Sequence, residues 1–139
     1  MKHPPQYLHN KVIDGIRIFN KYIFNRITLA FAESGKGPFS VIYHKGRHSG
    51  RTYRAPVLAS YVDETIIIPL SYGEKVDWLR NTLAQGGCEI IRKNERIGAT
   101  NPEVIDSAAA FAILPEKRRR LFERFKMEKF LRLQVVGKK

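Results

Sequence analysis

A short loop at residues 44–51 carries the densest set of groups that could hold an anion. It reads HKGRHSGR, with three cationic side chains, a serine hydroxyl and two glycines. Glycine lets the backbone turn with positive φ and exposes its N–H groups. No acidic residue occurs between Lys36 and Asp63. Such a loop predicts a site for phosphate or carboxylate groups, the alternative being a solvated hairpin tip.

A second segment, residues 71–81, could hold a planar ligand. Ser71, Tyr72 and Gly73 form a turn after an apolar strand, and the following helix carries the single tryptophan, Trp78. Trp78 and Asn81 are three residues apart and therefore share a helix face. A flat ring could stack on Trp78 or Tyr72 and accept hydrogen bonds from Asn81 and Ser71. Alternatively, Trp78 packs in the core and Asn81 caps a turn.

The apolar pattern indicates which elements position these two segments. After a loose arm over residues 1–10, apolar residues recur at three- and four-residue steps from Leu8 to Phe31, which predicts an amphipathic helix that ends by Pro38. We expect strands at Phe39–His44, Thr52–Val62, Thr65–Leu70, Cys88–Arg92, Arg96–Ala99 and Phe130–Val136. We expect further helices at Glu74–Gln85, Ser107–Leu114 and Pro115–Lys126.

Five or six short strands, mostly joined as hairpins with one helix inserted, favour a small barrel over a Rossmann sheet. The sequence also lacks the glycine-rich dinucleotide motif and the Walker loop. We therefore expect one domain over residues 1–139, of mainly β (α+β) class. An N-terminal arm and helix would occupy residues 1–36 and a barrel core residues 38–136.

The composition limits which cellular compartment and which binding partners we expect. The 139 residues have a net charge of +12 and a pI near 10.1, which favours anionic partners such as nucleic acid, anionic lipid or a phosphorylated cofactor. The single cysteine, Cys88, excludes a disulfide framework and fits a reducing compartment. No apolar run of membrane-spanning length and no signal peptide is visible, so we expect a cytoplasmic protein.

Four stretches occur in an order that is fairly specific. They are residues 46–57 (GRHSGRTYRAPV), Ser71-Tyr72-Gly73, Asp77-Trp78-x-x-Asn81 and Ala84-x-Gly86-Gly87-Cys88. Together they resemble the deazaflavin-dependent nitroreductase and quinone reductase family, over about residues 39–105 and the last strand. The resemblance implies a split β-barrel, like the FMN-binding barrels of the pyridoxamine-phosphate oxidase type. It also implies binding of coenzyme F-420, a deazaflavin with a phosphate and an oligoglutamate tail.

The resemblance also implies a set of cofactor-binding residues. The basic loop and the strand after it would hold the phosphate and the acidic tail through Lys45, Arg47, His48, Ser49, Gly50, Arg51 and Arg54. The strand backbone at Pro56 and Val57 would line the ring system. The ring would lie near Ser71, Tyr72 and Gly73 and would be fixed by Trp78 and Asn81.

The implied chemistry is hydride transfer from C5 of the reduced deazaflavin to a small-molecule acceptor, which in the family is a quinone, a nitro-aromatic or an activated alkene. Ser71 or Tyr72 would then donate a proton or orient a water. A hydroxyl near the ring can satisfy the negative charge that develops on the acceptor.

Several positions depart from the family pattern. His48 stands where the family often has Lys or Arg, and Tyr53 where some branches have Arg. The C-terminal pocket tyrosines of the nitroreductase branch are absent, and Phe125 and Phe130 are the nearest aromatic residues. Because the relatives include members that use ordinary flavins, FMN stays an alternative cofactor. The departures also keep open an alternative function, that of a split-barrel protein that binds FMN or another anionic cofactor without reductase activity.

Other features carry less specific hypotheses. A nucleic-acid-binding protein is the third hypothesis, because the charge suits it but no recognised motif does. His44 and His48 lie in a loop without a nearby carboxylate, so we expect no metal site. We interpret Cys88 as a small buried hydrophobe rather than a reactive thiol, and the basic face of residues 115–129 as solvated rather than as a docking site. We expect the N-terminal helix to pack on the barrel or to contact an anionic membrane. We expect the chain to be a monomer or a homodimer.

Overall fold

The computed structural model describes residues 39–138, and the predicted N-terminal arm and helix lie outside them. The described strands are β1 (Ser40–Lys45), β2 (Thr52–Val57), β3 (Ser60–Val62), β4 (Thr65–Pro69), β5 (Gly87–Arg92), β6 (Glu95–Asp106) and β7 (Lys129–Lys138). The helices are α2 (Asp77–Gln85), α3 (Ser107–Ile113) and α4 (Glu116–Arg124). The strands form one seven-stranded sheet in the order β2-β1-β5-β6-β7-β4-β3, and every neighbouring pair is antiparallel.

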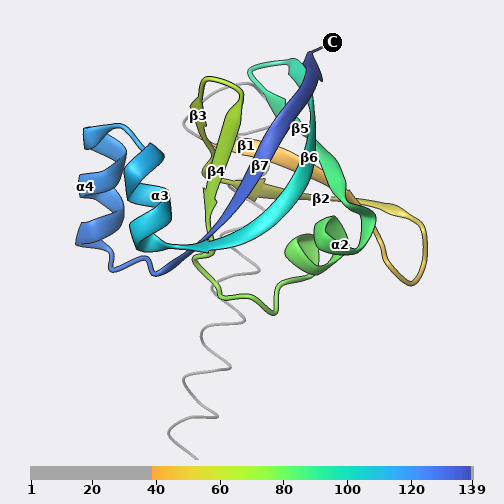
Figure 1. The fold of residues 1–139 in the computed structure, drawn as a ribbon. Helices are drawn as coiled ribbons and strands as arrows, with labels where there is room; N and C mark the ends of the chain where they lie inside the picture. Colours follow the sequence, from red (N-terminus) through yellow and green to blue (C-terminus); the bar gives the residue numbers. More distant parts are fainter. Residues whose placement is uncertain (1–38, 139) are drawn as a thin grey trace, which may run out of the picture.

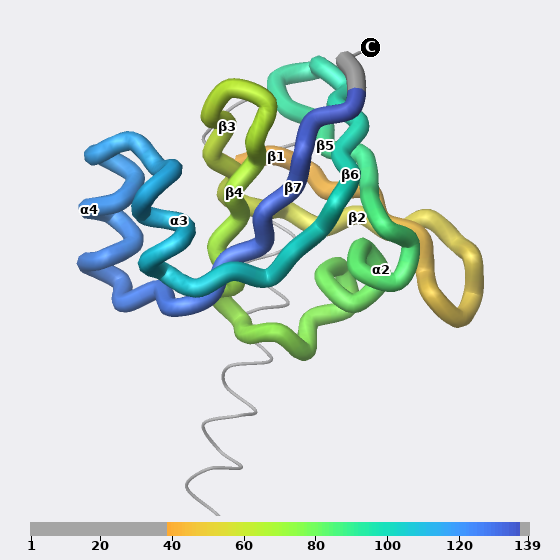
Figure 2. Tube along the Cα trace, viewed as in Figure 1, coloured from red at the N-terminus to blue at the C-terminus, as the bar shows by residue number. Residues whose placement is uncertain are grey.

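The connection between the two edge strands shows that this sheet is curled. β2 and β3 lie at opposite edges of the sheet, yet only Leu58 and Ala59 separate them in the chain. The three Cα–Cα steps from Val57 to Ser60 span at most about 11 Å, so the two edges must approach each other there. The sheet accordingly forms a half-barrel (Figures 1 and 2), which confirms the prediction of a mainly β fold with flanking helices.

Three consecutive isoleucines in β4 show that the half-barrel is covered on both faces. Ile66 and Ile68 belong to a core shared with α2, whereas Ile67 packs on the opposite face with α3 and α4. All three side chains are fully buried. Successive residues of a strand point to opposite faces, so this strand needs apolar residues at every position rather than at alternate ones.

The stretch predicted as a single strand, Thr52–Val62, is two strands in the structure, and that prediction was wrong. β2 ends at Val57 and β3 begins at Ser60. Val57 and Ala59 both pack into the same core, so the alternation of apolar residues continues across the break. The sheet consequently has seven strands instead of five or six.

Strand β6 is much longer than predicted. The sequence pattern indicated Arg96–Ala99, but the strand continues to Asp106. Its pairing with β7 shifts register twice, the second time around Asn101, whose φ is 52°. A β-bulge bends a strand without ending it, so Asn101-Pro102, which reads as a turn in the sequence, is a bend within one long strand.

The helices occupy the predicted regions with shifted ends. α2 begins at Asp77 and ends at the cap residue Gly86, whose φ is 74°. Leu83 is exposed, whereas the polar residues Asn81 and Thr82 are buried. α3 and α4 lie together on the side of the sheet away from α2 (Figure 1). No helix among the described residues is long and apolar enough to cross a membrane.

Candidate functional site

The loop between β1 and β2 is closed by its own hydrogen bonds. The Gly46 N–H donates to the Arg51 carbonyl at 2.7 Å, and the Gly50 N–H donates to the Gly46 carbonyl at 2.9 Å. The Ser49 hydroxyl accepts from the Arg51 N–H at 3.2 Å and lies 3.0 Å from the Tyr53 hydroxyl. A Cβ at Gly46 would lie 2.5 Å from Ser49 Oγ and 2.8 Å from a ring carbon of Tyr53, so a larger residue there would displace these side chains. These hydrogen bonds give the loop a defined turn, in which residues 48–51 stay exposed.

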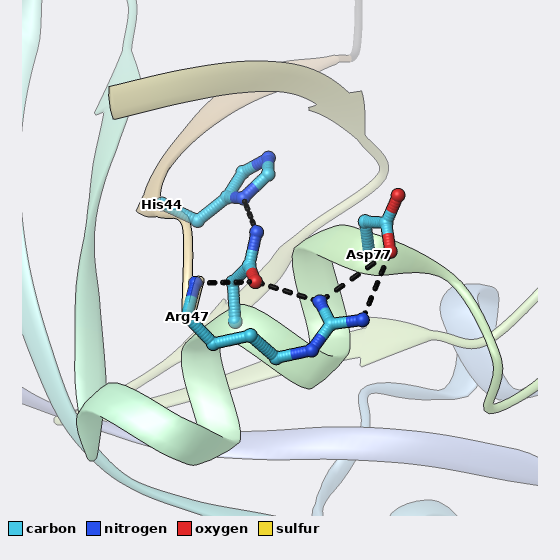
Figure 3. A network of polar contacts seen from close by, with 4 residues as sticks. His44, Arg47 and Asp77 are labelled. Atoms are coloured by element: carbon cyan, nitrogen blue, oxygen red, sulfur yellow. Dashed lines mark hydrogen bonds and ion pairs between the residues drawn. The ribbon is translucent and has the colours of Figure 1, made fainter. Parts of the chain in front are cut away.

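Two side chains of α2 fix this loop by contacting Arg47 (Figure 3). Asn81 Oδ1 accepts from the Arg47 backbone N–H at 3.0 Å and from Arg47 Nη1 at 2.8 Å. Asp77 Oδ1 lies 3.3 Å from Arg47 Nη2 and 3.4 Å from Nη1. Asn81 is buried, whereas the Asp77 side chain is 78% exposed. Asn81 thus holds both the main chain and the side chain of Arg47.

His44 completes the network from the end of β1. Asn81 Nδ2 lies 2.9 Å from His44 Nδ1. Because Asn81 Oδ1 faces two donors of Arg47, the amide nitrogen must donate to Nδ1, so the imidazole is neutral with its proton on Nε2. Burial lowers the pKa of His44, and the negative charge of Asp77 opposes that shift. The ring also stacks on Tyr53, with the centroids 5.9 Å apart.

A cavity of about 450 Å³, here called the loop cavity, opens beside this network. Its walls come from the loop, from β2 and from the start of α2. They carry two arginines and one acid. The lining residues are His44, Gly46, Arg47, His48, Ser49, Tyr53, Arg54, Ala55, Val76, Asp77, Trp78 and Asn81.

A second cavity of about 220 Å³, here called the strand-end cavity, adjoins the first. Val76 and Trp78 line both cavities. The walls of the second are mostly apolar and come from the ends of β2 and β4 and the turn after β4. The other lining residues are Phe39, Pro56, Val57, Leu58, Pro69, Leu70, Ser71, Tyr72 and Gly73.

Most of the residues predicted to bind a cofactor line one of these two cavities. The loop cavity takes Arg47, His48, Ser49, Arg54, Trp78 and Asn81. The strand-end cavity takes Pro56, Val57, Ser71, Tyr72 and Gly73, with Trp78 again. Lys45, Gly50 and Arg51 line neither. The part that each residue plays in binding stays a prediction.

Trp78 combines the two interpretations that its sequence position allowed. It is half-buried and packs against the core around Leu79, yet it lines both cavities. The indole is therefore held by the core and available to a ligand in either cavity.

Sequence reasoning missed His44, Asp77 and Val76 as site residues. Asp77 and Asn81 are four apart on a helix, and that spacing places both on one face. The spacing does not show that this face meets Arg47, because the contact joins residues far apart in the sequence. His44 was examined only as a metal ligand, and a buried histidine at a strand end gives no further signal in the sequence.

Cys88 lies outside both cavities and is partly buried against the core. Burial raises the pKa of its thiol to about 12, although a side-chain contact with Thr82 opposes the shift. The protonated thiol is a poor nucleophile at neutral pH, in agreement with its interpretation as a small hydrophobe. Within residues 39–138, no group of three His, Cys, Asp or Glu side chains is placed to hold a metal ion.

Comparison with known proteins supports the fold. No family model matches the chain, and no curated protein does. Nine chains of solved structures match. One of them is an F-420 reductase, with a TM-score of 0.50 and 12% sequence identity, and the match covers 73% of this chain and 90% of that one. At such identity the likeness shows a shared fold.

Proposed function

We propose that this protein is a split-barrel oxidoreductase that binds reduced coenzyme F-420 and passes a hydride to a small electron acceptor. One observation carries the proposal: a cationic cavity and an apolar cavity adjoin and share Trp78. The likeness to an F-420 reductase supports it at the level of the fold, and so does the ordered set of motifs in the sequence.

The two cavities match the two halves of a deazaflavin coenzyme. The loop cavity presents the guanidinium groups of Arg47 and Arg54 and the Ser49 hydroxyl. These donors suit a phosphate and a chain of carboxylates. The strand-end cavity presents apolar walls with few polar groups, among them Ser71, and such a lining suits a flat ring system. The residues present therefore fit the group.

When bound, the coenzyme would supply the hydride, and the chain would bind, orient and protonate. Trp78 would form the wall against which the ring lies. Asn81 would act indirectly, because its amide already holds Arg47 and His44. The hydroxyls of Ser71 and Tyr72 belong to an exposed turn, where they can exchange protons with water and pass one to the reduced acceptor.

A fluorescence titration tests the binding step directly. Trp78 is the only tryptophan of the chain, so quenching reports on the shared wall of the two cavities. We expect saturable quenching by coenzyme F-420 and weaker quenching by FMN. Arg54→Gln should weaken F-420 binding about 10- to 100-fold, because a charge-assisted hydrogen bond contributes about 1.5–3 kcal/mol. Arg124→Gln, a charge-matched change in α4, should leave the affinity unchanged.

The outcomes separate the hypotheses. Tighter binding of FMN would keep the fold and change the enzyme class. Absence of quenching by both compounds would contradict the proposal. If F-420 binds, the oxidation of its reduced form is then followed with a quinone, a nitro-aromatic and an enone as acceptors. Tight binding without turnover of all three would indicate a binding protein rather than a reductase.

A further inference from the structure

A third cavity, here called the turn cavity, lies apart from the basic loop and has a volume of about 260 Å³. The start of β1, strand β3, the turn between β5 and β6 and the start of α4 form its walls. The lining residues are Phe39, Ser40, Ala59, Ser60, Tyr61, Arg92, Lys93, Pro115 and Arg118. Apart from Phe39, which also lines the strand-end cavity, none of these residues belongs to the site described above.

Three cationic side chains from two separate elements meet at the turn cavity. Arg92 and Lys93 come from the β5–β6 turn and Arg118 from α4, and no acidic residue lines the cavity. In the described part of the chain none of the three forms an ion pair. The Arg92 guanidinium lies 4.3 Å from the centroid of the Tyr61 ring, a stacking contact that orients it. The lining of the cavity therefore carries three positive charges and no negative one.

Buried hydroxyl groups supply a second, independent indication of a ligand. Ser60 lines the cavity and is only 4% exposed, yet its hydroxyl has no hydrogen-bond partner within residues 39–138. The neighbouring pair is satisfied, since Ser40 Oγ lies 2.8 Å from the Tyr61 hydroxyl. Buried polar groups are nearly always paired in folded proteins. An acceptor oxygen in the cavity would give the Ser60 hydroxyl the partner that residues 39–138 do not provide.

The start of α4 lies at the same wall, where Pro115 and Arg118 line the cavity. Pro115 is the cap residue, and no side chain caps the helix. The first N–H groups of a helix have no partner within it, and the helix dipole makes that end favourable for an anion. Glu116 in the first turn pairs with Arg120, one turn further along.

We propose that the turn cavity binds the phosphate group of a small molecule. Guanidinium groups match the oxygens of phosphate in pairs, and three cations suit a doubly charged anion better than a single carboxylate. The volume exceeds that of one phosphate, which leaves space for a small organic group. This site goes beyond the proposed reductase function and does not depend on it.

Residue-resolved NMR tests the site, because the basic loop could also bind phosphate. The full chain labelled with ¹⁵N is titrated with inorganic phosphate at constant ionic strength, with acetate as the reference anion. We expect saturable shifts of the Ser60, Lys93 and Arg118 amides that fit one dissociation constant. Arg92→Gln with Arg118→Gln should weaken this binding at least tenfold. Arg80→Gln with Arg124→Gln, at two exposed positions that do not line the cavity, is the charge-matched control and should change it less than twofold.

Two further measurements keep the test decisive. Ser60→Ala should weaken phosphate binding about three- to tenfold without lowering the unfolding temperature, because the hydroxyl has no partner among the described residues. Glycerol phosphate is compared with inorganic phosphate. Tighter binding of the ester would identify a phosphorylated small molecule, and tighter binding of the free ion would identify phosphate itself. Equal weakening by both double variants, equal shifts with acetate, or absence of saturation at these amides would overturn the proposal.

Discussion

The loop between β1 and β2 and the helix pair α3–α4 project from opposite sides of the sheet in Figure 1, and different forces hold them. The helix pair is attached by an apolar cluster. Phe122 and Phe130 are almost fully buried, and their rings meet edge to face with centroids 5.4 Å apart. Phe111 contacts Phe130 in the same manner at 5.8 Å. Apolar burial has little directional preference, so many sequences could attach two helices in this way.

The loop, in contrast, is attached by a few directed hydrogen bonds. Asn81 contacts Arg47 on one side and His44 on the other, and each contact requires a particular atom at a particular place. A polar network of this kind contributes less free energy than an apolar cluster but defines one geometry more narrowly. The α3–α4 side is therefore held by apolar burial, whereas the loop side is held by polar contacts that define its geometry.

The largest effect on stability is expected from Phe130→Ala on the helix side. Removing a buried aromatic ring costs about 3–5 kcal/mol in the free energy of unfolding, and Phe130 contacts both Phe111 and Phe122. Chemical denaturation measures the loss. Phe125→Ala is the control, because this ring is 62% exposed and its removal should cost no more than about 0.5 kcal/mol. Similar losses for the two variants would show that the cluster is not what attaches the helices.

On the loop side, Asn81→Ala should destabilise the protein by about 2–4 kcal/mol. The substitution leaves His44 Nδ1 and the Arg47 N–H without partners, and each unpaired buried group costs about 1–3 kcal/mol. Hydrogen exchange of the loop amides should accelerate more than exchange in α3 and α4. The neighbouring substitution Arg80→Ala, at an exposed position, is the control. Unchanged loop exchange in Asn81→Ala would mean that the loop is held by its internal hydrogen bonds alone.

The same contrast explains how much the sequence could predict. Apolar patterns correctly indicated most strands, because a buried face leaves a regular pattern in the chain, and Pro115 correctly indicated the boundary between α3 and α4. The pattern failed at Val57 and Ala59, which keep facing one core while the chain passes from one edge of the sheet to the other. It failed at Asn101 because a bulge and a turn use the same residue types.

For the candidate site, the sequence indicated several of the side chains but not the hydrogen bonds that join them. Short motifs named Arg47 and Asn81, since charged and amide side chains near glycines suggest ligand binding. That the Asn81 amide is engaged by Arg47 and His44 follows from a contact between distant segments. Local spacing contains no information about such a contact. The turn cavity was invisible for the same reason, because its walls come from four separate parts of the chain.

A smaller effect is expected from pH, acting through His44. Burial lowers the pKa of this imidazole below its ordinary value of 6.5, so below pH 6.5 the unfolded chain takes up a proton that the folded chain does not. The free energy of unfolding should therefore decrease as the pH falls from 6.5 toward the lowered pKa, and then level off. Protonated Nδ1 can no longer accept from Asn81, so the loop should loosen over the same range.

Denaturation at a series of pH values, together with loop hydrogen exchange, measures this dependence. His44→Gln should flatten the part of the profile below pH 6.5. His48→Gln, a change at an exposed position of the same loop, should leave the profile as in the parent protein. A parallel decrease in the parent and in His44→Gln would assign the pH dependence to other groups.

The smallest effect is expected from Asp77→Asn, which separates the ion pair of the loop from its hydrogen bonds. The Asp77 side chain is 78% exposed and the contact with Arg47 is 3.3 Å long, so its loss should cost at most about 1 kcal/mol. Asp77 raises the pKa of His44, so its neutralisation should move the pH transition of the loop to lower pH. A stability loss as large as that of Asn81→Ala would show that the exposed ion pair, rather than the buried amide, holds the loop in place. A small loss with a displaced pH transition would show that Asp77 adjusts the charge of the network while Asn81 determines its geometry.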